Sequence, residues 1–188
     1  YTCGADSRPR RSAQTALWHI TASLVRLMGP ILSFTAEEVW RLFGNKGEDS
    51  VFFHTWHRVP EVSDAAALLA KWDRLRALRG PVRKQIEQLR IENKVGSSLQ
   101  AEVDVHINDA DYELLASLGD DLKYVMLTSA ARVFRADESR VVVTPSGHGK
   151  CERCWHYREE VGADARHPGL CGRCVGNLFG PGEPRPYA

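Results

Sequence analysis

The chain has 188 residues, of which 43% are hydrophobic and 26% are charged, and its formal net charge is +1. These values are ordinary for a globular protein of one large or two small domains, and no internal repeat or low-complexity segment appears. No apolar run approaches the roughly 18 residues that a membrane helix needs, so we expect no membrane segment. The chain also opens without the apolar core of a signal peptide, which favours a cytoplasmic location.

Residues 1–60 have the pattern of part of a helical bundle. From residue 12 to residue 28, apolar side chains recur at spacings of three and four, which predicts an amphipathic helix that Gly29 and Pro30 end. Residues 35–38 (T-A-E-E) have the form of a capping box and predict a second helix that stops at Gly44. The side chains that this helix is expected to bury are Val39, Trp40 and Phe43.

Residues 65–144 are expected to form a small α+β portion, which opens with a long helix over 65–93. Gly80 and Pro81 interrupt this helix, and because Pro81 cannot donate to the carbonyl of Ala77, we expect a kink or a break. The apolar stripe of the helix consists of Leu68, Trp72, Leu75, Val82, Ile86 and Leu89.

The rest of this portion alternates strands with short helices. Strict alternation over residues 99–107 predicts a half-buried strand, and residues 108–119 form a helix with an Asn/Asp cap. Residues 121–129 predict another short helical turn or strand. Two further strands are expected at 133–136 and 140–144, joined through residues 137–139.

Charge is unevenly distributed along this portion. Residues 71–94 contain eight Lys or Arg against three acids, whereas residues 101–121 contain seven acids and no Lys or Arg. A basic helix beside an acidic segment would orient the molecule against a polyanion. The alternative is a solvated helix face whose charge is compensated elsewhere.

The cysteines of residues 150–188 have the spacing of a metal site. Two C-x-x-C pairs separated by sixteen residues are typical of four thiolates around one structural zinc ion, namely Cys151, Cys154, Cys171 and Cys174. Disulfides are the alternative, but they need an oxidising compartment, and Cys3 leaves an odd count. A histidine could replace one thiolate; the candidates are His148, His156 and His167. The module is too small for a core of its own, so the metal should supply most of its folding free energy.

The sequence contains none of the motifs of a catalytic site that we sought, including G-x-S-x-G, Walker A, G-x-G-x-x-G and H-E-x-x-H. A zinc ion held by four thiolates has no open position for water, so it is structural. Around it, Arg153 and Arg173 occupy equivalent positions, and Trp155 follows the first pair. Guanidinium groups beside aromatic rings suit single-stranded nucleic acid. Alternatively, Trp155 covers the zinc site.

These residues resemble the C-terminal zinc module of the bacterial isoleucyl-tRNA synthetases. The resemblance rests on C-E-R-C-W-H-Y at 151–157, on H-P-G-L-C-G-R-C-V-G-N-L at 167–178 and on the tail G-E-P-R-P-Y-A at 182–188. Upstream, residues 10–17 and 28–40 resemble the anticodon-binding helical bundle of that family, and K-V-G-S-S-L at 94–99 resembles its helix-to-strand junction. The match covers essentially the whole chain in collinear order. Gly80 and Pro81 depart from the family pattern.

The resemblance implies a C-terminal fragment with a mainly α, α+β fold: part of a helical anticodon-binding bundle (1–60), a small α/β subdomain (65–144) and a zinc-ribbon-like module (150–188). The full-length family attaches isoleucine to its tRNA using ATP and is expected to be monomeric. The H-I-G-H and K-M-S-K-S signatures and the editing domain are absent here, so we expect the fragment to be inactive alone and to bind the anticodon stem-loop. The residues expected to contact tRNA are Arg153, Trp155, Arg173 and Asn177.

Two other functions keep the zinc ion and change the partner. The cysteine spacing also resembles the finger of formamidopyrimidine-type DNA glycosylases, although Tyr1-Thr2 does not fit the catalytic Pro-Glu start of that family. A zinc-stabilised module for protein interaction is the other alternative. RNA binding that weakens steeply with salt would separate the nucleic-acid function from the protein-binding one.

Overall fold

The structure is a computed structural model and describes residues 2–43 and 49–185. The chain divides into two compact units. The first contains Cys3–Ser63 and the chain from Pro181 onward, and the second contains Thr2 and Asp64–Gly180. The cysteine-rich segment therefore shares a unit with the α+β portion.

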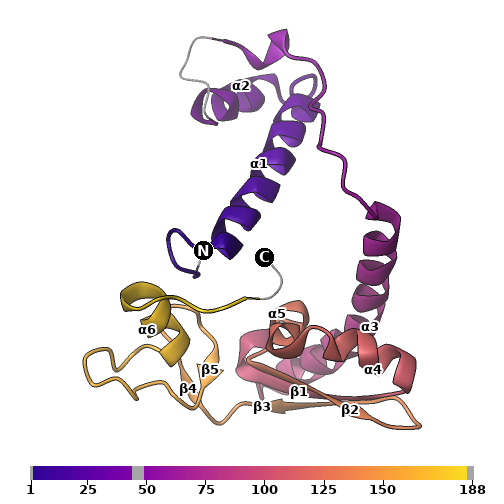
Figure 1. Cartoon of the computed structure of the whole chain (residues 1–188), viewed down its shortest axis with the longest axis vertical. Helices are drawn as coiled ribbons and strands as arrows, with labels where there is room; N and C mark the ends of the chain where they lie inside the picture. The colour runs from indigo at the N-terminus through magenta and orange to yellow at the C-terminus, as the bar shows by residue number, and fades with distance from the viewer. Residues whose placement is uncertain (1, 44–48, 186–188) are drawn as a thin grey trace. The chain divides into compact units, whose positions relative to one another are not determined.

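The first unit is built on two helices, α1 (Arg8–Met28) and α2 (Ser33–Leu42), which pack against each other (Figure 1). As predicted, α1 stops at Gly29, which is its C-cap residue. The 3-10 turn Val51–Phe53 packs on both helices. The small core that the three elements share consists of Val25, Ala36, Trp40 and Val51.

The capping box predicted at residues 35–38 is wrong. The helix begins at Ser33 with Leu32 in the N-cap position, so those residues already lie inside it. Glu37 instead accepts hydrogen bonds from the Ser50 hydroxyl (2.8 Å) and the Val51 N–H (3.1 Å), which ties the 3-10 turn to α2. Phe43, predicted to be buried, is only half-buried, and the predicted stop at Gly44 lies outside the described residues.

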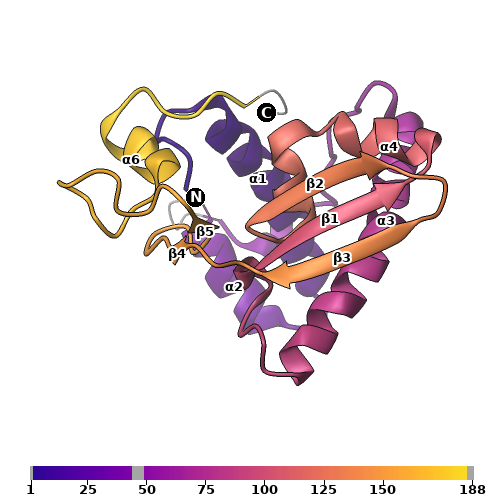
Figure 2. The same ribbon diagram turned by 90° about the horizontal axis from the view of Figure 1, so that it is seen from below.

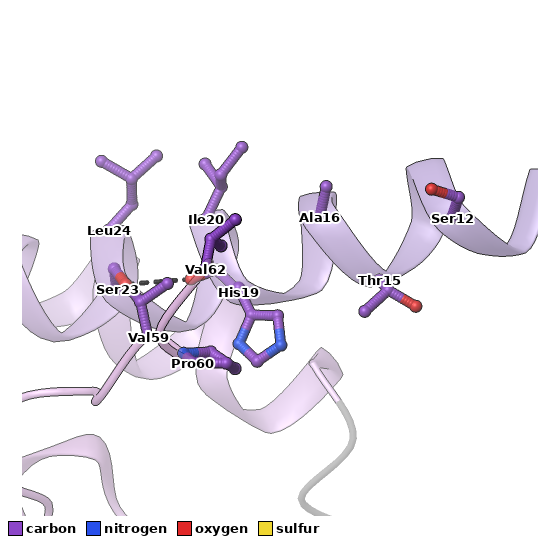
Figure 3. A pocket seen from close by; sticks show the side chains of 10 residues that line it. All are labelled: Ser12, Thr15, Ala16, His19, Ile20, Ser23, Leu24, Val59, Pro60 and Val62. Atoms are coloured by element: carbon purple, nitrogen blue, oxygen red, sulfur yellow. Dashed lines mark hydrogen bonds between the residues drawn. The ribbon is translucent and has the colours of Figure 1, made fainter. Parts of the chain in front are cut away.

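The apolar residues from which the helix α1 was predicted are largely exposed. The exposed fractions of Leu17, Ile20 and Leu24 are 60%, 53% and 50%. Part of the stripe lines an open hollow of about 720 Å³ between α1 and the segment at residues 59–62 (Figure 3). Apolar periodicity therefore identified the helix correctly, but it did not identify what the stripe contacts.

The second unit contains a three-stranded sheet in which β1 (Ala101–Ile107) lies between β2 (Ala130–Arg135) and β3 (Arg140–Pro145) (Figure 2). β1 pairs in parallel with β2 and antiparallel with β3. The parallel pair requires a crossover, which α4 (Asp109–Ala116) and α5 (Leu122–Met126) supply. Buried and partly exposed residues alternate along β1, as predicted for a half-buried strand.

Helix α3 (Ala65–Ile91) lies with α4 and α5 on one side of the sheet (Figure 1). The predicted stripe is buried at Leu75, but Leu68 and Trp72 are exposed, because the core starts one turn beyond them. Of the kink or break expected at Pro81, the break does not occur, and α3 continues through this residue. Burial of Leu75, Val82 and Ile86 on either side of Pro81 holds the helix together. The core residues of this unit are Leu75, Val82, Ile86, Ala101, Val103, Val105, Ile107, Leu115, Leu118, Leu122, Met126 and Val143.

Short turns and caps complete this portion. Two 3-10 turns, Ser98–Gln100 and Gly119–Asp121, precede β1 and α5. The Asn108 side chain accepts a hydrogen bond from the Asp111 N–H at 3.4 Å, which confirms the predicted cap of α4.

The cysteine-rich segment consists of the strand pair β4 (Gly149–Lys150) and β5 (Tyr157–Arg158), followed by α6 (Gly172–Phe179). The hydroxyl of Ser129, the residue before β2, links it to the rest of the unit. The Ser129 Oγ accepts a hydrogen bond from the Tyr157 N–H (2.6 Å) and donates one to the Leu99 carbonyl.

Candidate metal centre and nucleic-acid interface

The fold brings the four predicted cysteines together. Cys151 and Cys154 lie on the turn between β4 and β5, whereas Cys171 is the N-cap residue of α6 and Cys174 lies in its first turn. The four Sγ atoms lie within 4.8 Å of one another, and all four side chains are buried.

The spacing of the sulfurs fits zinc. A Zn–S bond of about 2.3 Å gives a tetrahedron whose sulfurs are about 3.8 Å apart. The Cys154 and Cys171 Sγ atoms are 3.7 Å apart, whereas a disulfide would need about 2.05 Å. The hydrogen bond with the Cys154 thiol and burial raise the pKa of Cys171, because both disfavour its thiolate form. The donor set therefore suits a divalent ion.

Hydrogen bonds from the surrounding chain orient two of the sulfurs. The Cys171 N–H donates to the Cys151 Sγ at 3.3 Å, and the Arg153 guanidinium donates to the Cys174 Sγ at 3.7 Å. Such donors around a metal site orient its ligands and offset the charge of the thiolates.

None of the three candidate histidines joins the sulfur cluster. His148 lies near Glu102 (3.7 Å), and the His167 ring stacks on Phe179 with ring centroids 4.0 Å apart. His156 is buried, and its Nδ1 lies 3.1 Å from the Cys154 carbonyl oxygen. Burial is the largest of the effects that lower the pKa of His156.

Trp155 is 55% exposed. Its backbone is left-handed (φ 64°), its N–H donates to the Cys151 carbonyl (2.9 Å), and its indole N–H donates to the Glu152 carbonyl (3.1 Å). The apolar cover of the cluster comes instead from Val161 and Leu170. The ring is therefore available to an outside partner.

The other three residues expected to contact RNA are less exposed than Trp155. Arg153 and Arg173 are half-buried, and both donate hydrogen bonds to Thr2, at 2.7 Å and 3.0 Å. Asn177 is only 8% exposed, so the structure does not bring it to the surface beside Trp155.

Sequence reasoning missed three neighbours of these residues. The Lys150 ammonium lies 5.8 Å from the Trp155 ring centroid, and the Arg173 guanidinium lies 5.4 Å from the Tyr124 ring centroid. Lys123 is 3% exposed and pairs with Asp120, and burial is the main cause that lowers its pKa. Lys150 pairs with Tyr157 in the β4–β5 hairpin, which places it near Trp155.

Two family models match the chain. Residues 2–106 match the anticodon-binding domain of tRNA ligase. The chain belongs to this family. Residues 149–176 match the zinc finger found in FPG and IleRS, which agrees with one structural zinc ion. The resemblance to the synthetases is thus confirmed, and the glycosylase alternative does not account for the match over residues 2–106.

Members of this anticodon-binding family with high identity are isoleucine--tRNA ligases. Those of Janthinobacterium sp. (strain Marseille) and Aromatoleum aromaticum are 56% and 54% identical to the chain over 194 and 192 residues. That of Laribacter hongkongensis is 54% identical over 188 residues. Each alignment covers 100% of this chain but 20% of the relative, so the chain spans about a fifth of the length of these proteins. No helix among the described residues is both long and apolar enough to cross a membrane.

Proposed function

We propose that the chain is the part of an isoleucine--tRNA ligase that binds the anticodon stem-loop of isoleucine tRNA. The observation that carries this proposal is the collinear match of an anticodon-binding domain and a zinc finger to one chain. In the whole ligase, ATP-dependent attachment of isoleucine would take place elsewhere, because residues 1–188 lack the signatures of the adenylating core. The chain alone is then a binding module in a cytoplasmic enzyme.

We further propose that Cys151, Cys154, Cys171 and Cys174 bind one zinc ion. When bound, a structural zinc ion joins the two cysteine turns and supplies folding free energy on the order of 10 kcal/mol. The chain contributes the thiolates, the N–H and guanidinium donors that face them, and the apolar cover.

RNA contact is proposed for Trp155, whose exposed ring offers a stacking surface for an unpaired base. Lys150 supplies positive charge beside it. Arg153 and Arg173 supply charge close to the sulfur cluster, although each already has one hydrogen bond to Thr2. We assign Asn177 to the inner structure of the module, because its side chain is buried.

Metal content, measured together with binding to isoleucine tRNA at two salt concentrations, tests the proposal. We expect one zinc ion per chain and binding that weakens with salt and is lost in Cys171→Ser, because phosphate contacts release counterions. Cys3→Ser is the matched control: this thiol is buried but lies outside the cluster, so zinc content and binding should persist. Zinc without tRNA binding at low salt would refute the RNA function and favour a module for protein contacts.

A further inference from the structure

A second hollow, of about 420 Å³, lies in the second unit among α3, the turn at residues 96–98 and the end of α5. Three arginines of α3 line it: Arg79, Arg83 and Arg90. Ser97 and Ser98 contribute hydroxyl groups. The remaining lining residues are Ile86, Glu87, Gly96, Met126 and Leu127.

Two of these arginines are uncompensated. Arg90 pairs with Glu87 at 3.0 Å, and Glu87 is the one acid among the residues that line the hollow. Arg79 and Arg83 form no ion pair within residues 2–43 and 49–185, and the Arg79 Nε is buried without a hydrogen-bond partner there. A buried guanidinium N–H without an acceptor is uncommon in folded proteins and calls for an explanation.

The other arginines of α3 are paired, whereas Lys84, on the same helix but outside the hollow, forms no ion pair among the described residues. Arg74 pairs with Asp111, and Arg76 pairs with Asp73. A generally solvated basic face would not confine its unpaired arginines to the rim of one hollow. The pattern therefore indicates a local site for an anion rather than a helix made soluble by charge.

We infer that this hollow binds a phosphate group of the RNA backbone, an inference that rests on the proposed function. Guanidinium forks match phosphate oxygens, and the serine hydroxyls add neutral donors. Backbone phosphates carry no sequence information, so this contact would strengthen binding without selecting the anticodon.

A short segment of chain links the hollow to the cysteine-rich module. Leu127 lines the hollow, and two residues later Ser129 accepts the hydrogen bond from Tyr157, which follows Trp155 by two residues. The hollow and Trp155 therefore belong to one unit and are linked through this hydrogen bond.

Binding of isoleucine tRNA and of a tRNA with another anticodon, measured across a salt series, tests this inference. In Arg79→Gln/Arg83→Gln, one lost phosphate contact should reduce the slope of log K against log salt by about 0.7–0.9 for both RNAs. The ratio of the two affinities should stay unchanged. Arg79→Lys/Arg83→Lys keeps the charge and should largely restore the slope. The matched control is Arg41→Gln/Arg76→Gln, which removes two exposed arginines that are already paired, and it should leave the slope near that of the wild type.

The outcomes separate the inference from the proposed function. If the wild type binds RNA but the Arg79→Gln/Arg83→Gln variant keeps its slope, the phosphate site is refuted and the proposed function stands. A changed affinity ratio would also overturn the inference, since it would indicate contact with bases. Failure of the wild type to bind either RNA at low salt would refute both. Zinc content and circular dichroism of each variant verify its folding.

Discussion

Replacement of Trp155 by alanine should weaken the binding of isoleucine tRNA while zinc content stays at one ion per chain. The ring is 55% exposed and takes no part in the apolar cover of the sulfur cluster, so its removal should leave the metal site intact. Stacking of one base on an aromatic ring contributes about 1–3 kcal/mol, which corresponds to a loss of affinity of roughly 5- to 150-fold.

Two further variants isolate stacking from other effects of the substitution. Trp155→Phe loses only the indole hydrogen bond to Glu152 and keeps a stacking face, so its affinity should stay within a few-fold of the wild type. Phe179→Ala removes another exposed aromatic ring, one that already stacks on His167 within the module, and should change RNA affinity little.

Fluorescence anisotropy with a labelled anticodon stem-loop, at fixed salt and with excess zinc, measures these affinities. Base stacking on Trp155 is refuted if Trp155→Ala binds as tightly as the wild type while Cys171→Ser does not bind. That pair of results would mean that the metal is needed but the exposed ring meets no base.

Three further predictions concern stability. Leu75→Ala should lower the free energy of unfolding by about 2–5 kcal/mol in urea titrations, whereas Leu68→Ala, at a site 47% exposed on the same helix, should cost less than about 1 kcal/mol; equal losses would contradict the core assigned to α3. The Arg74 hydrogen bond lowers the pKa of Asp111, so its stabilisation is present above the unfolded pKa of about 3.9 and is lost as the pH falls through the folded pKa. Asp111→Asn should therefore flatten the acid limb of a stability–pH curve, and an unchanged limb would refute this pairing. Chelation of zinc should speed hydrogen exchange at residues 149–180 before it does so in β1, and simultaneous loss of protection would show that the sheet also depends on the metal.

The elements that could be predicted from sequence are those whose signal is local. Strict alternation predicted β1 because a period of two has no other common origin. The sheet order could not be predicted in the same way. Residues 137–139 connect β2 to β3 along the chain, yet the two strands lie on opposite sides of β1, which only long-range packing decides.

In the candidate site, too, the residues that could be predicted from sequence are those whose signal is local. Cysteine spacing predicted the four sulfurs that meet, since each C-x-x-C turn brings its own pair together. Asn177 was expected to contact RNA, but its side chain is buried within α6. At residues 35–38 a capping pattern was present, yet the helix had already begun at Ser33, so a local rule gave the wrong start.

The left-handed backbone at Trp155 decides whether the free-energy cost of ordering its ring falls on folding or on RNA binding. The left-handed conformation is less favourable by about 1–2 kcal/mol for a residue with a β-carbon. Such a conformation persists only where the surrounding structure requires it. Here two hydrogen bonds within the turn hold the residue. Immobilising a mobile side chain on association costs about 0.5–1.5 kcal/mol. Because the folded turn already holds the ring, that cost falls on folding, and the arriving base meets a preorganised surface.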